Sequence, residues 1–230
     1  MKDFLITGVN SGLGKYLYSK LPNSLGLNRD NFDLIKDEEY QTIIHCAFNK
    51  ENVITNYKKY LDDNIFLLQR LKNLKYKKFI YISTIDVYQK EQNMYSLFKK
   101  FSESLLDKED LILRCSMMLG DTMKPNHLTK IKSNIPQISL SGDSTFNYIL
   151  MDDLVEFFIS QECLNYAGVV DFISNANVTL YEVKNTLSSN TELGDYTYES
   201  NLDFINPIFK LNNKYNKSSI ENLTNYDRFL

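Results

Sequence analysis

Short apolar runs alternate with amphipathic stretches along the first half of the chain. Runs typical of buried strands, which are short and rich in apolar and β-branched side chains, occupy residues 4–6, 24–27, 42–47, 78–83 and 111–114. Between these runs, apolar side chains recur at helical spacing over residues 12–21, 56–74 and 95–106. This alternation predicts βαβ units, whose right-handed crossovers place helices on both faces of a parallel sheet. The expected fold class is therefore α/β, with a doubly wound parallel sheet.

The pattern changes after Gly120. Residues 121–135 are polar, contain Pro125 and predict a loop with one short helix. Further predicted elements are strands over residues 137–140 and 169–173 and helices over residues 152–161 and 180–187, followed by a tail from residue 190 that is rich in Asn, Tyr and Ser. We therefore expect a doubly wound domain over residues 1–120, with a small C-terminal α/β lobe over residues 121–230 that is interleaved with it.

Composition narrows the class of protein. The chain has 230 residues, of which 43% are hydrophobic, and this suffices for one large domain with a sizeable core. Its 26 basic and 29 acidic residues give a net charge of −3, which favours neither a nucleic acid nor an anionic membrane as partner. No apolar run is long enough to span a bilayer, and the apolar stretch near the N-terminus is too short for a signal peptide. We expect a cytoplasmic location.

The cysteines and histidines are few and dispersed. Cys46, Cys115 and Cys163 lie far apart, which argues against a disulfide framework. His45 and His127 have no metal-ligand spacing with these cysteines, so no metal site is expected.

A glycine-rich segment joins the first predicted strand to the first predicted helix. Gly8 permits a tight turn, Gly12 lets the backbone approach a pyrophosphate, and Gly14 allows the helix to pack close to the strand. The free amides and positive dipole end of the helix then favour phosphate groups. The segment predicts a dinucleotide site, with a tight turn that binds no ligand as the alternative. The predicted cofactor contacts here are Gly8, Asn10, Ser11, Gly12, Leu13 and Gly14.

The residues after the second predicted strand bear on the choice of cofactor. A site selective for NAD usually places an acidic side chain there, on the ribose hydroxyls. This chain has Asn28 and Arg29 instead, and a guanidinium can pair bidentately with a ribose 2′-phosphate. The pattern favours NADP(H) over NAD(H), with Arg29 as a mere surface residue as the alternative.

A hydroxyl, a phenol and an ammonium form the candidate catalytic group. Tyr95 and Lys99 are four residues apart and share one face of a predicted helix. A nearby ammonium favours the phenolate, so we expect Lys99 to lower the pKa of Tyr95 toward working pH. Thr84 ends a predicted strand whose tip opens into the same crevice. Tyr95 would then act as general acid or base, beside the Thr84 hydroxyl.

With these motifs in order, the chain resembles the extended branch of the short-chain dehydrogenase/reductase superfamily, the NAD-dependent epimerase/dehydratase family. The similar segments span residues 2 to about 187: the glycine segment, Ile43-Ile44-His45-Cys46-Ala47, Asn64, Phe79-Ile80-Tyr81-Ile82-Ser83-Thr84-Ile85-Asp86-Val87-Tyr88, the Tyr95/Lys99 pair, Leu113-Arg114 with Gly120, and Tyr148-Ile149-Leu150-Met151-Asp152-Asp153-Leu154. The resemblance implies a Rossmann-like fold, a nicotinamide cofactor and a homodimer built on two helices of each copy. It assigns catalysis to Thr84, Tyr95 and Lys99, further cofactor contacts to Asn28, Arg29, Cys46, Ala47, Phe48 and Lys99, and substrate contacts to Thr84, Asp86, Ser116 and Met117.

The chain departs from the branch at three places. Its glycine spacing is that of the smaller, non-extended branch, and Ser11 stands where the middle glycine is usual. Ile85 occupies the position of the catalytic acid of sugar-nucleotide dehydratases, which disfavours 4,6-dehydration. Asn147 stands where many members have an Arg near the nucleotide diphosphate.

Two features resemble the 4-keto-sugar reductases of the branch, of the dTDP-4-dehydrorhamnose reductase type. Residues 28–42 leave room for only a short strand and a turn, and Arg114-Cys115-Ser116 is similar to their Arg-Thr-Ser stretch. The resemblance therefore implies an NAD(P)-dependent reductase acting on the keto group of a nucleotide-activated sugar, in the synthesis of surface-polysaccharide precursors. An NAD-dependent nucleotide-sugar epimerase and a non-catalytic nucleotide-binding protein of the same fold stay open as alternatives.

Overall fold

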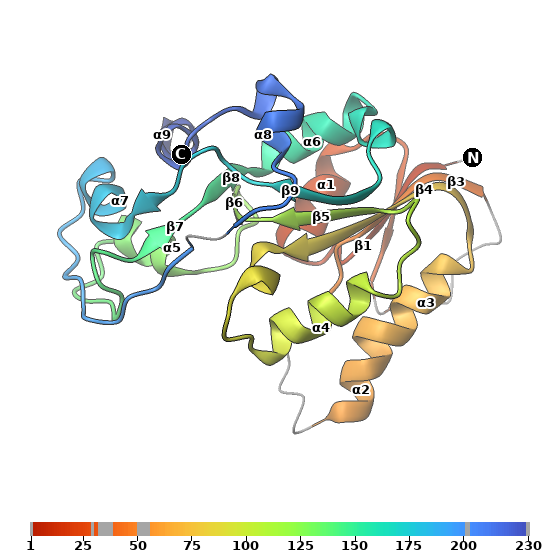
Figure 1. The fold of residues 1–230 in the computed structure, drawn as a ribbon, viewed down its shortest axis with the longest axis horizontal. Coiled ribbons are helices and arrows are strands. Elements are labelled where there is room, and N and C mark those ends of the chain that lie inside the picture. Colours follow the sequence, from red (N-terminus) through yellow and green to blue (C-terminus); the bar gives the residue numbers. More distant parts are fainter. Residues whose placement is uncertain (1, 29, 32–38, 50–55, 201–202, 229–230) are drawn as a thin grey trace.

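A parallel sheet lies at the centre of the molecule (Figure 1). The computed structural model describes residues 2–28, 30–31, 39–49, 56–200 and 203–228. Within this part of the chain, six strands pair in parallel in the order β2-β1-β3-β4-β5-β9. They are β1 (Lys2–Thr7), β2 (Ser24–Leu27), β3 (Glu39–His45), β4 (Lys75–Thr84), β5 (Leu111–Cys115) and β9 (Gly168–Phe172). The predicted α/β class and parallel sheet are confirmed.

The strands bury side chains on both faces of this sheet, which explains their continuous apolar runs. Leu5 of β1 and Phe79 of β4 belong to a core on one face. Their neighbours in the chain, Ile6 and Ile80, belong to a second core on the opposite face. Because these strands carry apolar side chains on both faces, neither face of the sheet can be left in water. Helices must therefore cover both faces.

Helices provide this cover (Figure 1). One face carries α1 (Gly12–Lys20) and α6 (Met151–Ile159), and the other carries α2 (Tyr57–Leu61), α3 (Leu67–Lys72) and α4 (Met94–Glu103). Between α2 and α3, residues Asp62–Phe66 form a π-helical turn, so that one helical stretch with an irregular middle takes the place of the regular helix predicted over residues 56–74.

A smaller lobe with its own core follows the large sheet. Its strands are β6 (Met117–Leu119), β7 (Thr145–Phe146), β8 (Tyr148–Leu150) and β10 (Val178–Thr179), and its helices are α5 (His127–Lys132), α7 (Leu180–Thr186) and α9 (Ser219–Arg228). β6 pairs with β8 in parallel and β7 with β10 in antiparallel orientation. A further short helix, α8 (Ile208–Leu211), contacts β9 of the large sheet. The division of the chain at residue 120 into two domains stays a prediction.

The strand predicted over residues 137–140 was wrong. Gln137 and Leu140 form isolated bridges to Glu192 and Tyr196 of the tail instead. The apolar positions there serve the core of the small lobe, because Ile138 is buried in it. Pairing with the tail fixes this segment without a continuous ladder, and a local pattern does not reveal such a long-range partner.

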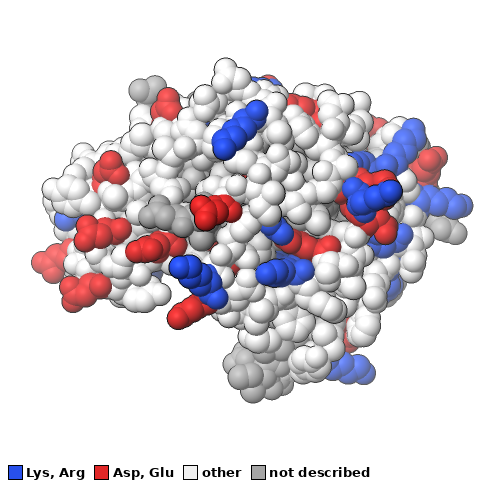
Figure 2. Space-filling model, in the orientation of Figure 1, with Lys and Arg blue, Asp and Glu red and all other residues white. Residues whose placement is uncertain are grey.

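The surface carries charges of both signs. On the face drawn in Figure 2, acidic side chains gather over the small lobe, and acidic and basic side chains are interspersed over the rest. Among the helices of the described residues, none has the length and apolar character that a membrane span requires.

Candidate active site

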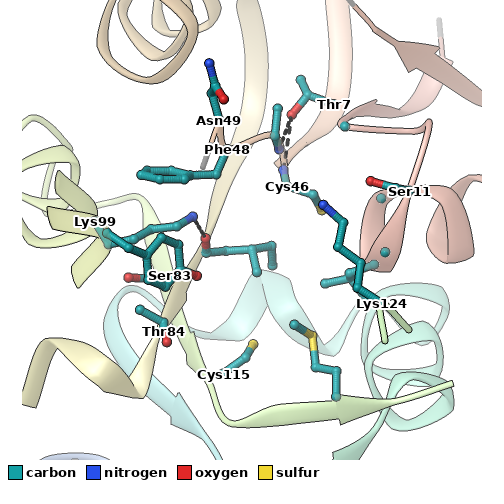
Figure 3. Close-up of a pocket in the computed structure, with 18 of the residues that line it drawn as sticks. Thr7, Ser11, Cys46, Phe48, Asn49, Ser83, Thr84, Lys99, Cys115 and Lys124 are labelled. Carbon is teal, nitrogen blue, oxygen red and sulfur yellow. Dashed lines mark hydrogen bonds between the residues drawn. The ribbon is translucent and has the colours of Figure 1, made fainter. Parts of the chain in front are cut away.

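One large cavity opens where the carboxyl ends of β1, β3, β4 and β5 meet. Its volume is about 1660 Å³. In open α/β sheets this edge is where ligands bind. Every predicted site residue within the described part of the chain lines it: Gly8, Asn10, Ser11, Gly12, Leu13, Gly14, Asn28, Cys46, Ala47, Phe48, Thr84, Asp86, Tyr95, Lys99, Ser116 and Met117. Arg29, the basis for favouring NADP(H), lies outside the described residues. Figure 3 shows several of these side chains around the cavity.

The glycine loop has the geometry that close backbone approach requires. A Cβ at Gly14 would lie 2.5 Å from the carbonyl oxygen of Gly8, so no other residue fits between the helix and the strand end. Gly8 has a φ of +76°, which disfavours any side chain there. At Gly12 a Cβ would meet no atom within 4 Å, so the start of α1 faces open space. The loop therefore fits the diphosphate of a dinucleotide.

A buried hydroxyl fixes the next segment of the cavity wall. The Thr7 hydroxyl accepts hydrogen bonds from the amides of Cys46 (3.1 Å) and Ala47 (3.0 Å) and lies 2.7 Å from Nδ1 of His45. Burial lowers the pKa of His45 to about 3, so its imidazole is neutral. Because the Thr7 oxygen already accepts two amide hydrogen bonds, its hydroxyl is assigned as the donor to Nδ1. His45 thus acts through Thr7 to set the backbone beside the glycine loop. Figure 3 shows the hydrogen bonds from this backbone to Thr7.

The side chain of Asn64 holds the backbone of Asn49, which comes directly after Phe48, in place. Its Oδ1 accepts a hydrogen bond from the Asn49 amide at 2.7 Å, and its Nδ2 donates to the Asn49 carbonyl at 3.1 Å. Asp63 accepts a hydrogen bond from Nδ2 of Asn49 at 2.8 Å. Both Asp63 and Asn64 belong to the π-helical turn, an irregularity often found at functional sites. The π turn therefore ties the helix to the loop that carries Phe48.

The three predicted catalytic residues come together at the tips of β4 and α4. Thr84 is the last residue of β4, and its hydroxyl accepts a hydrogen bond from the Asp86 amide at 3.2 Å. Tyr95 and Lys99 lie one turn apart on α4, whose start is capped by Asn93. The Thr84 hydroxyl lies close enough to the Tyr95 phenol to influence its pKa. This proximity is the arrangement expected for shared contact with one substrate oxygen.

The phenol of Tyr95 titrates in the opposite direction to the prediction. Burial raises its pKa above the ordinary value, the Asp86 carboxylate adds to the rise, and the nearby Thr84 hydroxyl acts against it. The expected lowering by Lys99 was therefore wrong. Desolvation outweighs the attraction of the ammonium, so Tyr95 keeps its proton at neutral pH.

Lys99 is buried among backbone and aromatic groups. Its ammonium donates a hydrogen bond to the Ile82 carbonyl at 2.6 Å and lies 4.6 Å from the ring centroids of both Phe48 and Tyr81. The Phe48 ring also meets the Tyr95 ring edge to face, with centroids 5.0 Å apart. These contacts fix the ammonium near the phenol.

A buried network of charged and polar side chains lies next to the predicted catalytic residues, at the ends of β4 and β5. Arg114 of β5 donates two hydrogen bonds to Glu103 of α4, at 3.1 and 2.7 Å. The Ser83 hydroxyl donates to the same carboxylate at 2.5 Å. The network joins α4 to the ends of β4 and β5, and so sets Tyr95 and Lys99 against Thr84. Sequence analysis matched Arg114 to a family motif but did not predict this partner.

The tail of the chain supplies part of the opposite wall, which sequence analysis did not anticipate. Tyr198 and Ser200 line the cavity, and the Tyr198 hydroxyl donates to Asp86 at 3.3 Å. Gln89 donates hydrogen bonds to the Tyr198 hydroxyl (3.3 Å) and to the carbonyl of Glu199 (3.0 Å). No periodicity or motif marks this segment, because its place depends on contacts with distant residues.

Two buried serine hydroxyls at the cavity have no hydrogen-bond partner among the residues that the structure describes. They belong to Ser116, predicted to contact substrate, and to Ser200 of the tail. A buried hydroxyl without a partner is costly, and rotation about its side-chain bond can turn it toward a ligand. Both therefore suit a substrate that carries hydroxyl groups.

Asn147 has a structural task in this wall. Its Nδ2 donates to the Ser174 carbonyl and to Oδ1 of Asn177, and its Oδ1 accepts from the Ser174 amide. Its amide is thus engaged within the lobe. Groups of three or more His, Cys, Asp or Glu side chains that could hold a metal ion are absent from the described residues.

Comparisons with known proteins bear on the fold. No protein-family model and no curated protein matches the sequence. Among solved structures, a dTDP-4-dehydrorhamnose reductase from Bacillus anthracis, in complex with NADP, is similar with a TM-score of 0.76 at 18% identity over 100% of both chains. A UDP-N-acetylglucosamine 4-epimerase from Methanobrevibacter ruminantium, in complex with UDP-N-acetylmuramic acid, gives 0.75 at 18% identity over 100% of this chain and 98% of the other.

A UDP-glucuronic acid 4-epimerase from Bacillus cereus with NAD bound gives a TM-score of 0.70 at 18% identity, over 99% of this chain and 98% of the other. At these identities the likeness concerns the fold. The chain has the fold of these reductases and epimerases over at least 99% of its length.

Proposed function

We propose that this chain is an NAD(P)-dependent oxidoreductase of the extended short-chain dehydrogenase/reductase family. It reduces a keto group of a nucleotide-activated sugar, and the product serves the synthesis of surface-polysaccharide precursors. The observation that carries the proposal is the meeting of Thr84, Tyr95 and Lys99 in the cavity that the glycine loop opens. The fold shared with a dTDP-4-dehydrorhamnose reductase supports it.

The cavity provides the groups that a nicotinamide dinucleotide needs. The glycine loop and the start of α1 would hold its diphosphate, and Cys46, Ala47 and Phe48 would line its path toward the catalytic tip. Lys99 would hold the adjoining ribose. A bound reduced nicotinamide supplies the hydride that a keto carbon accepts.

Tyr95 supplies the proton for this reaction. Because its pKa is raised, the phenol is protonated at neutral pH and can donate to the oxygen of the substrate as the carbonyl becomes an alcohol. The Thr84 hydroxyl polarises the same oxygen by a hydrogen bond. A protonated phenol is the acid that a reduction needs.

Ser116, Met117 and Asp86 form the substrate side of the proposed site. The unpartnered hydroxyl of Ser116 offers a hydrogen bond to a sugar hydroxyl. Asp86 accepts hydrogen bonds, and Tyr198 already donates one to it. Met117 contributes an apolar contact at the edge of β6.

A titration with reduced cofactor tests the proposal. Nicotinamide fluorescence would report the binding of NADH and NADPH to wild type, to Tyr95→Phe and to a control, Tyr181→Phe, whose side chain is exposed on α7. Each sample would then receive a panel of nucleotide keto-sugars. We expect binding by all three and oxidation of the cofactor by wild type and Tyr181→Phe. Oxidation by Tyr95→Phe at the wild-type rate contradicts the proposal.

The alternatives predict other results in the same assay. An epimerase, which two of the similar structures favour, would interconvert sugars with no net oxidation of cofactor. A non-catalytic nucleotide-binding protein would bind cofactor without any activity that depends on Tyr95.

The preference for NADP(H) rests on Arg29. Within the described residues, Asn28 accepts hydrogen bonds from the amides of Asp30 (2.8 Å) and Asn31 (3.1 Å), so a tight turn follows β2. In the sequence, Arg29 follows Asn28 directly after this strand, where proteins of this fold usually read the ribose 2′ substituent. Replacing Arg29 by Gln should weaken NADPH binding about tenfold and leave NADH binding unchanged. Equal effects on both cofactors would contradict the preference.

We also propose that the protein is a cytoplasmic homodimer. Phe66, Met94, Leu97 and Phe101 are between 44% and 49% exposed, on the π turn and on α4. Apolar side chains in such a group suit burial against a second copy. Light scattering should give about twice the 26.9 kDa mass of the chain, and a monomer mass would contradict the dimer.

A further inference from the structure

A lysine from a loop of the small lobe lines the cavity. Lys124 belongs to the loop between β6 and α5 and lines the same cavity as Ser11 and Cys46. Figure 3 shows its side chain extended toward the part of the cavity that these two residues line. Sequence analysis placed Lys124 in a polar loop and gave it no role.

The loop that carries Lys124 is tied to the glycine loop. The Thr122 hydroxyl donates a hydrogen bond to the Gly12 carbonyl at 2.7 Å. At the start of the loop, the backbone of Gly120 lies so close to Met151 that a Cβ would be 2.6 Å from its sulfur. At its end, Asn126 caps α5 through a capping box. Both ends and the middle are therefore anchored, and the position of Lys124 follows from built contacts.

The charges around the cavity are unevenly spread. Among the described residues, the cations that line it are Arg70, Lys99 and Lys124. Lys99 is buried at the catalytic tip against the Ile82 carbonyl, and Arg70 comes from α3. Lys124 is exposed, and the described part of the chain places no carboxylate within ion-pair distance of it. Asn147, where related proteins have an arginine, is neutral and engaged with Ser174.

This arrangement provides charge where an anion would sit. The amides at the start of α1 face open space at Gly12, and they attract phosphate oxygens from one side. An ammonium on the opposite side of the same space would neutralise a diphosphate as a point charge. An apolar or nucleoside group gains nothing from it.

We propose that Lys124 binds the diphosphate group of a ligand in this cavity and so fastens the loop of residues 120–126 over the glycine loop. The inference rests on the proposed function, which places two diphosphates in this cavity. One is that of the dinucleotide cofactor, and the other is that of the nucleotide sugar. The glycine loop and Lys124 recognise the same chemistry in either.

Binding measurements on four proteins test this role. Wild type, Lys124→Gln, Lys124→Arg and a control, Lys130→Gln, would be titrated with NADH and NADPH, and with UDP and dTDP in the presence and absence of cofactor. Lys130 is exposed on α5 of the same lobe, six residues along the chain, and does not line the cavity. Circular dichroism would verify that each variant is folded.

We expect Lys124→Gln to weaken at least one class of diphosphate about tenfold or more, with Lys124→Arg close to wild type and Lys130→Gln unchanged. A loss for NADH and NADPH alone assigns Lys124 to the cofactor, and a loss for UDP and dTDP alone assigns it to the substrate. If Lys124→Gln binds all four ligands as wild type does, the inference is overturned.

Failure of the proposed function has a different signature. A wild type that binds neither NADH nor NADPH contradicts the nicotinamide-dependent reaction itself. The binding of UDP and dTDP alone then decides the inference about Lys124. If wild type binds neither of these ligands, the proposed function and the inference are both overturned.

Discussion

The ammonium of Lys99 donates a hydrogen bond to the carbonyl of Ile82 at 2.6 Å, one helical turn from the phenol of Tyr95. The carbonyl belongs to β4, the strand that ends at Thr84. This bond therefore joins the helix that carries two of the proposed catalytic groups to the strand that carries the third.

Replacing Lys99 by Met should abolish this link. Because Lys99 would hold the cofactor ribose and fix α4 at the strand, we expect kcat to fall by about 100-fold or more. The matched control is Lys100→Met, an exposed neighbour on the same helix. Steady-state kinetics with NADPH would compare the two variants with wild type. Wild-type rates from both variants would show that Lys99 has no part in the reaction.

The Thr84 hydroxyl should be needed for rate more than for binding. Thr84→Val removes the hydrogen bond that polarises the substrate oxygen, and a loss of about 100-fold in kcat is expected. Thr84→Ser keeps the hydroxyl and should retain most of the activity. If Ser and Val at this position behave alike, the hydroxyl has no part in the reaction.

Tyr95 predicts a simple dependence of reduction on pH. Its pKa is raised, so the phenol carries its proton at all pH values up to and above neutrality. The rate constant kcat/KM for reduction should stay level from about pH 6 to about pH 9, and the reverse oxidation should speed up as pH rises. A reduction rate that falls through neutral pH would mean that the pKa of the acid is lowered well below the ordinary tyrosine value.

His45 predicts an acid sensitivity of the fold. Its folded-state pKa is lowered to about 3 by burial and by the nearby Lys99, and burial lowers that of His127 to about 4. Below the unfolded value of about 6.5, the unfolded chain binds protons that the folded chain refuses, so stability falls as pH drops from there toward 3. In an NMR titration of the folded protein, the His45 ring signals should stay constant between about pH 7 and about pH 5. A midpoint near 6.5 would show that His45 is accessible to protons.

The Arg114–Glu103 pair should contribute strongly to stability. Both side chains are largely buried, at 11% and 6% exposure, so Arg114→Met leaves a buried carboxylate without its partner. We expect the free energy of unfolding in urea to fall by about 3–5 kcal/mol. Lys214→Met, which breaks the exposed pair with Glu156, should cost less than about 1 kcal/mol. Equal losses would show that the buried Arg114–Glu103 pair contributes no more to stability than an exposed ion pair.

The sheet and the site residues near it could be predicted from sequence because local signals fix them. Parallel strands bring their carboxyl ends to one edge, so Gly12, Thr84 and Tyr95 had to approach the same crevice once the βαβ order was recognised. The helix α9 had a local signal that was overlooked, a Ser218–Glu221 capping box at its start.

The rest depends on contacts between distant parts of the chain. Tyr198 reaches the cavity because Ser144 and Thr145 fix the backbone of the tail beside β7. The titration of Tyr95 was predicted in the wrong direction because the spacing to Lys99 says nothing of how deeply the phenol is buried. Tertiary burial and long-range pairing leave no periodic mark in the sequence.

Transfer of a labelled hydride tests the central claim most directly. Wild type and Tyr95→Phe would be incubated with NADPH that carries deuterium at the transferable position and with a nucleotide keto-sugar, and the sugar product would be examined by mass spectrometry and NMR. We predict an alcohol with deuterium on the reduced carbon from wild type, and no such product from Tyr95→Phe. An unlabelled, epimerised sugar, or labelled alcohol formed equally well without the Tyr95 hydroxyl, would contradict the account.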